Sequence, residues 1–109
     1  MAQWHLDELR GALERRGWRV TAELPGDDYK ISGTWELRRS GDPCILLIDF
    51  DGLDDMRVLP LHRRYACRTR STEHSLYFHR RREAGSQPCA HWRQKLSRFI
   101  EAISERTAV

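Results

Sequence analysis

Two segments of the chain repeat apolar residues at the spacing of an amphipathic helix. Near the N-terminus, Leu6, Leu9 and Leu13 recur every three or four residues, and Gly17 follows them as a residue suited to a helix end. Near the C-terminus, a single apolar stripe comprises Trp92, Leu96, Phe99, Ile100 and Ile103. Side chains three or four residues apart share one face of a helix. The spacing therefore predicts a helix over residues 3–16 and a second helix around the C-terminal stripe.

Between these helices the pattern changes to a period of two, which is typical of β-strands with one buried face. Apolar residues occupy every second position from Trp18 to Leu24. The run from Cys44 to Phe50 is apolar except at Asp49, as in a central strand. Turn sequences rich in Pro, Gly, Ser and Asp separate the segments. The predicted strands cover residues 18–24, 29–38, 44–50, 56–59, 65–70 and 74–80.

The order of elements is helix, five or six strands, helix, without a repeat or a linker. We expect a single α+β domain over residues 1–109, with an antiparallel meander and both helices packed on one face of the sheet. This order resembles the frataxin-like fold in topology. The acidic ridge of that fold has no counterpart in this sequence, so no iron chemistry is inferred.

The chain is mildly basic, and its positive charge is almost entirely arginine. The formal net charge is +3, the pI is about 9.0, and Lys30 and Lys95 are the only lysines. Arginine forms bidentate contacts with carboxylates and phosphates, which suits an acidic partner. Three widely spaced cysteines and an N-terminus without an apolar segment predict a cytoplasmic protein with reduced thiols. No segment reaches the length of a membrane span, so we expect no membrane association.

The last predicted hairpin collects candidate binding residues. Leu76 and Phe78 should face the core, so their neighbours should lie on the outer face of the sheet. Arginines from the preceding strand should join them. The predicted partner-binding residues are Arg68, Arg70, Tyr77, His79 and Arg81. Arginine interleaved with an aromatic residue on an open sheet is a pattern that binds single-stranded nucleic acid or an acidic protein surface. The leading hypothesis is a small non-catalytic binding protein without a cofactor, and a chaperone- or immunity-type interaction protein is an alternative.

A second hypothesis rests on the acidic residues that end the third strand. The sequence Ile-Asp-Phe-Asp-Gly from Ile48 resembles motif I of haloacid-dehalogenase-type phosphatases. That resemblance implies a nucleophile at Asp49, a proton donor at Asp51 and magnesium between carboxylates. Leu53 departs from the residues that usually follow the glycine in that motif. Asp54 and Asp55 extend the cluster, so a metal site formed by these four aspartates is the alternative to partner binding.

Overall fold

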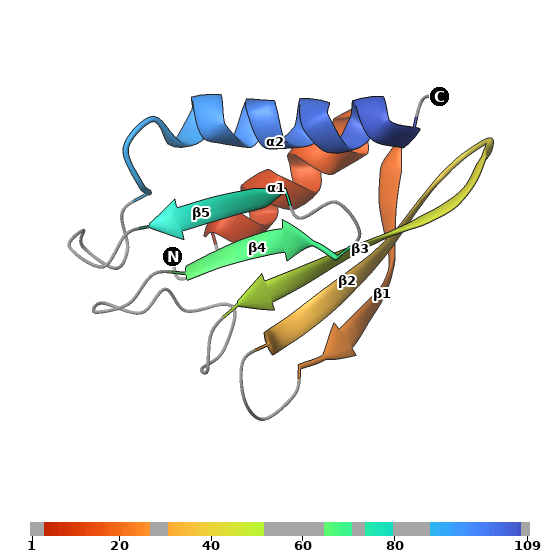
Figure 1. Cartoon of the computed structure of the whole chain (residues 1–109), viewed down its shortest axis with the longest axis horizontal. Helices are drawn as coiled ribbons and strands as arrows, with labels where there is room; N and C mark the ends of the chain where they lie inside the picture. The colour runs from red at the N-terminus through yellow and green to blue at the C-terminus, as the bar shows by residue number, and fades with distance from the viewer. Residues whose placement is uncertain (1–3, 27–30, 52–64, 71–73, 80–87, 108–109) are drawn as a thin grey trace.

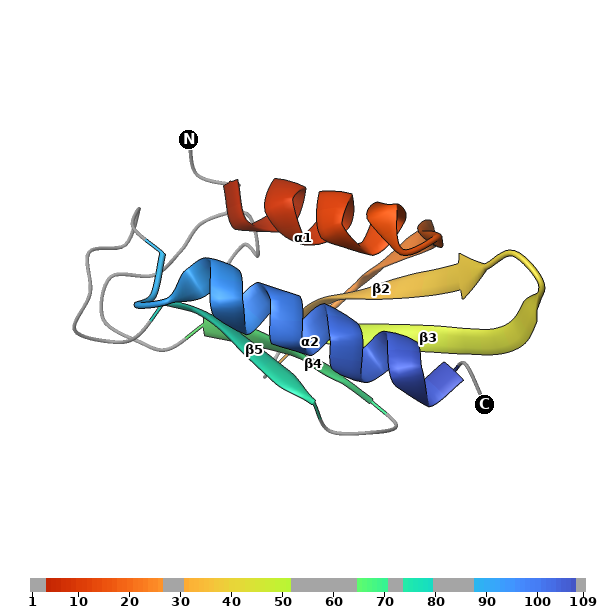
Figure 2. The same ribbon diagram turned by 90° about the horizontal axis from the view of Figure 1, so that it is seen from above.

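Both helices pack against the same face of one antiparallel sheet, as Figures 1 and 2 show. Helix α1 covers Trp4–Arg15 and helix α2 covers Trp92–Thr107. The structure, a computed structural model, describes residues 4–26, 31–51, 65–70, 74–79 and 88–107. The strands of this described part are β1 Trp18–Pro25, β2 Ile31–Arg39, β3 Asp42–Asp51, β4 Tyr65–Thr69 and β5 Ser75–His79.

The sheet is a simple meander, in which each strand pairs with the next strand in the chain. The spatial order is β1-β2-β3-β4-β5, and every pairing is antiparallel. Gly17 and Gly41 adopt positive φ values of 86° and 79° at the end of α1 and in the β2–β3 turn. The predicted α+β class and meander are confirmed. The predicted strand over residues 56–59 lies outside the described residues.

The core lies between the helices and the sheet, and the two helical stripes supply eight of the twenty residues in its described cluster. Leu9 and Leu13 of α1 are fully buried, and all five residues of the predicted C-terminal stripe are at most 7% exposed. From the sheet, Ile48 and Phe50 of β3 are fully buried. Apolar burial on this scale is the main stabilising contribution to a domain of this size. Strand β3 is therefore the centre of the sheet, and its residues Leu46, Ile48 and Phe50 face the core, whereas Cys44 and Ile45 at its start are exposed.

A β-bulge in β1 reverses the predicted alternation of that strand. Val20 pairs with Leu37, but the next pair is Ala22 with Glu36, so Thr21 is the extra residue. Because one extra residue turns the following side chains to the other face, Leu24 lies opposite Thr34 and is 44% exposed. The expectation that Leu24 shares the buried face with Trp18 was wrong for this reason.

A second bulge lies at the end of β5. Tyr65 pairs with His79 and Ala66 with Tyr77, so Phe78 is the extra residue. Phe78 and His79 are consequently both fully buried. The predicted outward position of His79 was wrong, because the bulge breaks the alternation at that point.

No helix in the described ranges has both the length and the apolar character that a bilayer crossing needs.

Candidate partner-binding face

The sheet face turned away from α1 and α2, here named the outer face, is the candidate site. Strand pairing and side-chain alternation assign its members in the described ranges. They are Arg19, Ala22, Leu24, Ile31, Thr34, Glu36, Arg38, Ile45, Leu47, Asp49, Asp51, Ala66, Arg68, Arg70, Ser75 and Tyr77. Figure 2 shows that the helices cover only the opposite face.

Large apolar side chains are exposed on this face. Among the described residues, the large apolar side chains that are strongly exposed are Leu24, Ile45 and Tyr77, at 44%, 46% and 39%. All three belong to the outer face. Scattered single apolar residues are ordinary on a protein surface, but their restriction to one face marks it as a candidate interaction surface.

Asp49 is the centre of a hydrogen-bonded group on the outer face. The Arg70 guanidinium donates from Nε to Oδ2 at 3.1 Å and from a terminal nitrogen to Oδ1 at 2.7 Å. The Thr34 hydroxyl donates to Oδ1 at 2.7 Å across the β2–β3 pairing. Asp49 is only 8% exposed, so its carboxylate is held by partners rather than by water.

These contacts decide the protonation of both partners. Burial alone raises the pKa of the Asp49 carboxyl group, but the hydrogen bonds from Arg70 and Thr34 outweigh it, so the pKa lies below its ordinary value. The hydrogen bond to Asp49 in turn raises the pKa of Arg70. Asp49 is therefore ionised at neutral pH.

Arg68 forms a weaker ion pair with Asp51, two residues along β3 from Asp49. Its guanidinium lies 3.5 Å from Asp51 Oδ2, and both side chains are nearly half exposed, at 49% and 44%. An exposed pair at this distance contributes little to stability. Arg68 and Arg70, two of the predicted binding residues, thus lie beside Asp51 and Asp49, which are two of the four aspartates of the competing metal hypothesis.

The least compensated positive charge is at the other end of the outer face. Arg19 of β1 and Arg38 of β2 lie directly opposite each other in the antiparallel pairing. Arg38 Nε is 3.6 Å from Glu36, and both side chains are partly exposed. Within the described ranges, Arg19 has no carboxylate at ion-pair distance. Like charges directly opposite on a sheet repel each other, so an external anion would be stabilised between them.

Three of the five predicted binding residues lie on the outer face. Arg68, Arg70 and Tyr77 lie on it together. His79 is buried and is removed from the contact set, and Arg81 lies outside the described residues. Sequence reasoning missed Arg19 and Arg38, because only the strand register brings them together. The sequence offered one clue, because Arg19 lies near the start of the first predicted strand and Arg38 at the end of the second, and these positions meet in an antiparallel hairpin.

The metal hypothesis finds no assembled ligand set in the described part. Asp49 and Asp51 both lie on the outer face, but each faces an arginine rather than a second carboxylate. Asp54 and Asp55 lie outside the described residues. Within the described ranges, no group of three or more His, Cys, Asp or Glu side chains is placed to hold a metal ion.

The buried thiols are poor candidates for nucleophilic chemistry. Cys67 is fully buried in the core, and burial strongly raises its pKa, so the reactive thiolate form is disfavoured. Cys89 is 2% exposed, and its sulfur lies 3.0 Å from the backbone carbonyl oxygen of Tyr77.

Comparisons of the chain with protein families, with curated proteins and with solved structures find no match.

Proposed function

We propose that this protein is a non-catalytic binding protein that takes an acidic protein partner on its outer face. The observation that carries this proposal is the opposed pair Arg19 and Arg38, two guanidinium groups on an exposed sheet face with one weak carboxylate contact between them. A partner carboxylate placed between them would relieve their repulsion and could accept several N–H donors.

The side chains near this pair favour a partner that is both acidic and apolar. Ile45, which is 46% exposed, lies across from Arg38 on β3, because their neighbours Leu46 and Leu37 pair with each other. Leu47 lies next, and the backbone N–H of Arg70 donates to its carbonyl oxygen at 3.0 Å. Apolar side chains with arginines on both sides match a surface that carries carboxylates around an apolar centre.

A protein partner fits this face better than nucleic acid does. The described outer face carries four arginines, Arg19, Arg38, Arg68 and Arg70, against three carboxylates, Glu36, Asp49 and Asp51, which gives a net charge of +1. Nucleic-acid sites present several uncompensated cations along a phosphate backbone, and the carboxylates here would repel phosphates. Tyr77 is the single aromatic side chain on this described face, whereas single-strand platforms stack successive bases on several.

Fluorescence anisotropy with two labelled probes tests the proposal. One probe is an extended peptide of alternating glutamate and valine, and the other is a single-stranded oligothymidine of similar charge. At low salt the peptide should bind the wild-type protein, and Arg19→Glu should weaken this binding by about tenfold or more. Arg98→Glu is the matched control, because Arg98 is exposed on α2 beside β5, at the other edge of the sheet from Arg19 and Arg38.

The outcomes separate the two classes of partner. Peptide binding that is insensitive to Arg19→Glu, or equally sensitive to Arg98→Glu, contradicts a role for the outer face. Tighter binding of the oligothymidine than of the peptide, lost in Arg19→Glu, would assign the face to nucleic acid instead. A chaperone- or immunity-type role is a special case of the proposal. It would appear as a stable acidic protein that co-purifies with the wild type and is absent from the Arg19→Glu variant.

A further inference from the structure

Gly11 stands in the middle of α1 without a reason inside the described molecule. Glycine in a helix interior costs about 1 kcal/mol relative to alanine. A Cβ atom built on Gly11 would meet only a terminal guanidinium nitrogen of Arg15, at 3.6 Å, which is an ordinary contact. Glycine is common where a second backbone or a ligand approaches closely. The missing side chain therefore points to an external neighbour at this position.

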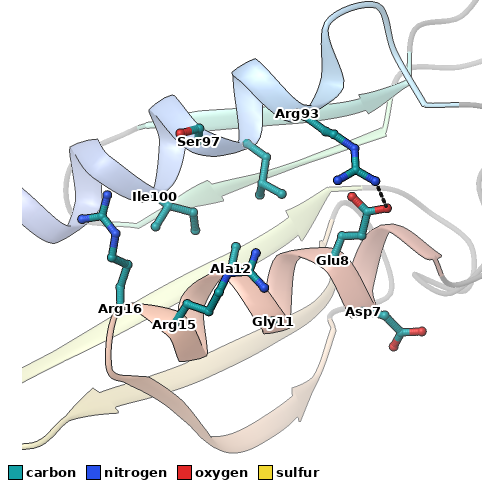
Figure 3. A pocket seen from close by; sticks show the side chains of 10 residues that line it. Asp7, Glu8, Gly11, Ala12, Arg15, Arg16, Arg93, Ser97 and Ile100 are labelled. Carbon is teal, nitrogen blue, oxygen red and sulfur yellow. Dashed lines mark ion pairs between the residues drawn. The ribbon is translucent and has the colours of Figure 1, made fainter.

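Gly11 lines a groove of about 530 Å³ between α1 and α2. Figure 3 shows its walls and the ion pair that joins them at one end. The pairs that connect the two helices are Glu8 with Arg93 at 3.9 Å and Arg16 with Glu101 at 3.8 Å. Between these pairs the groove is lined by Gly11, Ala12, Leu96, Ser97 and Ile100. The groove has a mainly apolar floor, and the Arg15 guanidinium reaches over Gly11 at its edge.

Two exposed charges flank Gly11 on the same line of the helix. Asp7 stands four residues before it and Arg15 four residues after it, so all three lie along one side of α1. Neither charge has an ion-pair partner among the described residues. The line is acid, glycine, base. Read in the reverse direction it is base, glycine, acid, so it is complementary to itself.

We propose that α1 packs antiparallel against α1 of a second copy of this chain, about a two-fold axis at Gly11. A two-fold interface requires a self-complementary surface, and the line of Asp7, Gly11 and Arg15 is one. Each Asp7 then pairs with Arg15 of the second copy, and the two glycines allow the helix backbones to approach. Glu14 would lie near Glu8 of the second copy, whose charge is offset within its own chain by Arg93 and by the Trp92 Nε1–H, which donates to Glu8 at 2.8 Å.

The helix dipole offers a competing reason for the two charges, though not for the glycine. An acid in the first turn and a base in the last turn stabilise a helix in a monomer. That explanation leaves Gly11 destabilising without a purpose and predicts no dependence on protein concentration. The proposed pairing accounts for all three residues. It is independent of the proposed function, because the outer face lies on the other side of the sheet.

A charge-reversal cycle tests the pairing by sedimentation equilibrium from micromolar to millimolar protein. The wild type should form a dimer within this range. Asp7→Arg and Arg15→Asp should each raise the dimer dissociation constant by about tenfold, because like charges meet twice across the axis. The double variant Asp7→Arg/Arg15→Asp restores both pairs and should return to within about threefold of the wild type. Arg98→Asp, an equal charge change elsewhere on the surface, should leave dimerisation unchanged.

Variants at Gly11 give a second test, because the same substitution should stabilise the monomer and weaken the dimer. Gly11→Ala should raise the melting temperature of the dilute monomer, because alanine favours the helix, and should weaken the dimer. Gly11→Leu should abolish the dimer while circular dichroism shows an intact fold. A wild type that stays monomeric, or a double variant that fails to restore what each single variant loses, overturns the proposal. If inorganic phosphate then raises the melting temperature of the wild type but not of Arg15→Asp, the groove is a site for a small anion.

Discussion

Arg70 binds both carboxylate oxygens of Asp49, at 3.1 and 2.7 Å, although the two residues lie on either side of the β3–β4 connection. This bidentate contact joins β3 to the end of β4. It also uses the charge of one predicted binding arginine inside the protein. The outer face is therefore less basic than its arginine content suggests, and its free positive charge lies elsewhere.

The first prediction concerns this pair. Arg70→Gln should destabilise the protein by about 1 kcal/mol at neutral pH, a value reduced from that of a buried pair because the Arg70 side chain is 55% exposed. Since the pKa of Asp49 in the folded protein lies below its ordinary value of 3.8, the pair stabilises the fold above about pH 4. Its contribution is lost as the pH falls through the lowered pKa.

Urea unfolding of wild type and Arg70→Gln at about pH 7 and about pH 3 measures both effects. The difference between the two proteins should shrink at the lower pH. Arg68→Gln is the matched control and should cost no more than about 0.5 kcal/mol, because its pair with Asp51 is exposed. If Arg70→Gln and Arg68→Gln lower the free energy of unfolding equally, the Arg70–Asp49 contact is no more stabilising than an exposed ion pair.

The second prediction concerns the opposed arginines of β1 and β2. Arg19→Glu replaces a repulsion with an attraction across the strand pair, so it should raise the free energy of unfolding by about 0.5 kcal/mol. The same change should weaken binding of an acidic peptide. A variant that is more stable and binds less tightly is the signature of a residue kept for binding. Loss of stability in Arg19→Glu, measured by chemical denaturation, would show that the two side chains do not face each other.

The third prediction tests the bulge in β1. Leu37→Ala removes a fully buried side chain and should cost about 2–5 kcal/mol. The same substitution at Leu24, which is 44% exposed on the outer face, should change stability by no more than about 0.5 kcal/mol. Thermal unfolding compares the two variants directly. Similar losses would mean that Leu24 lies in the core and that the strand alternates without interruption.

The fourth prediction concerns His79. Its side chain is fully buried, and neither ring nitrogen has a hydrogen-bond partner in the described structure. Burial of an unpaired polar group is unfavourable, so His79→Leu should stabilise the protein by about 1 kcal/mol. His74→Leu, at a partly exposed position beside β5, should have a much smaller effect. A destabilised His79→Leu variant in calorimetry would indicate that the imidazole makes a required polar contact.

The sequence predicts the helices and the strand order well, because both follow from local periodicity. The stripe of α2 and the leucines of α1 are buried as their spacing indicates. The bulges at Thr21 and Phe78 escape such reasoning, since both residues fit their local patterns. A bulge is fixed by which residues pair across two strands, and pairing is a property of the whole sheet.

The candidate site depends on strand register still more strongly. Arg68 and Arg70 are placed on the expected face, but the sequence does not show that Asp51 and Asp49 lie beside them. The opposition of Arg19 and Arg38 is likewise invisible until β1 and β2 are aligned. Composition identifies arginine as the relevant side chain, and register decides which arginines are available.

The two-sided character of β3 has a consequence for how this protein can evolve. Leu46, Ile48 and Phe50 face the core, whereas Ile45, Leu47 and Asp49 face outward on the same ten-residue strand. Packing restrains the first set, whereas the proposed partner would be the main restraint on Ile45 and Leu47. Substitution rates among descendants of this sequence should therefore alternate along β3 with a period of two. The outward positions would then record a change of partner while the fold stays the same.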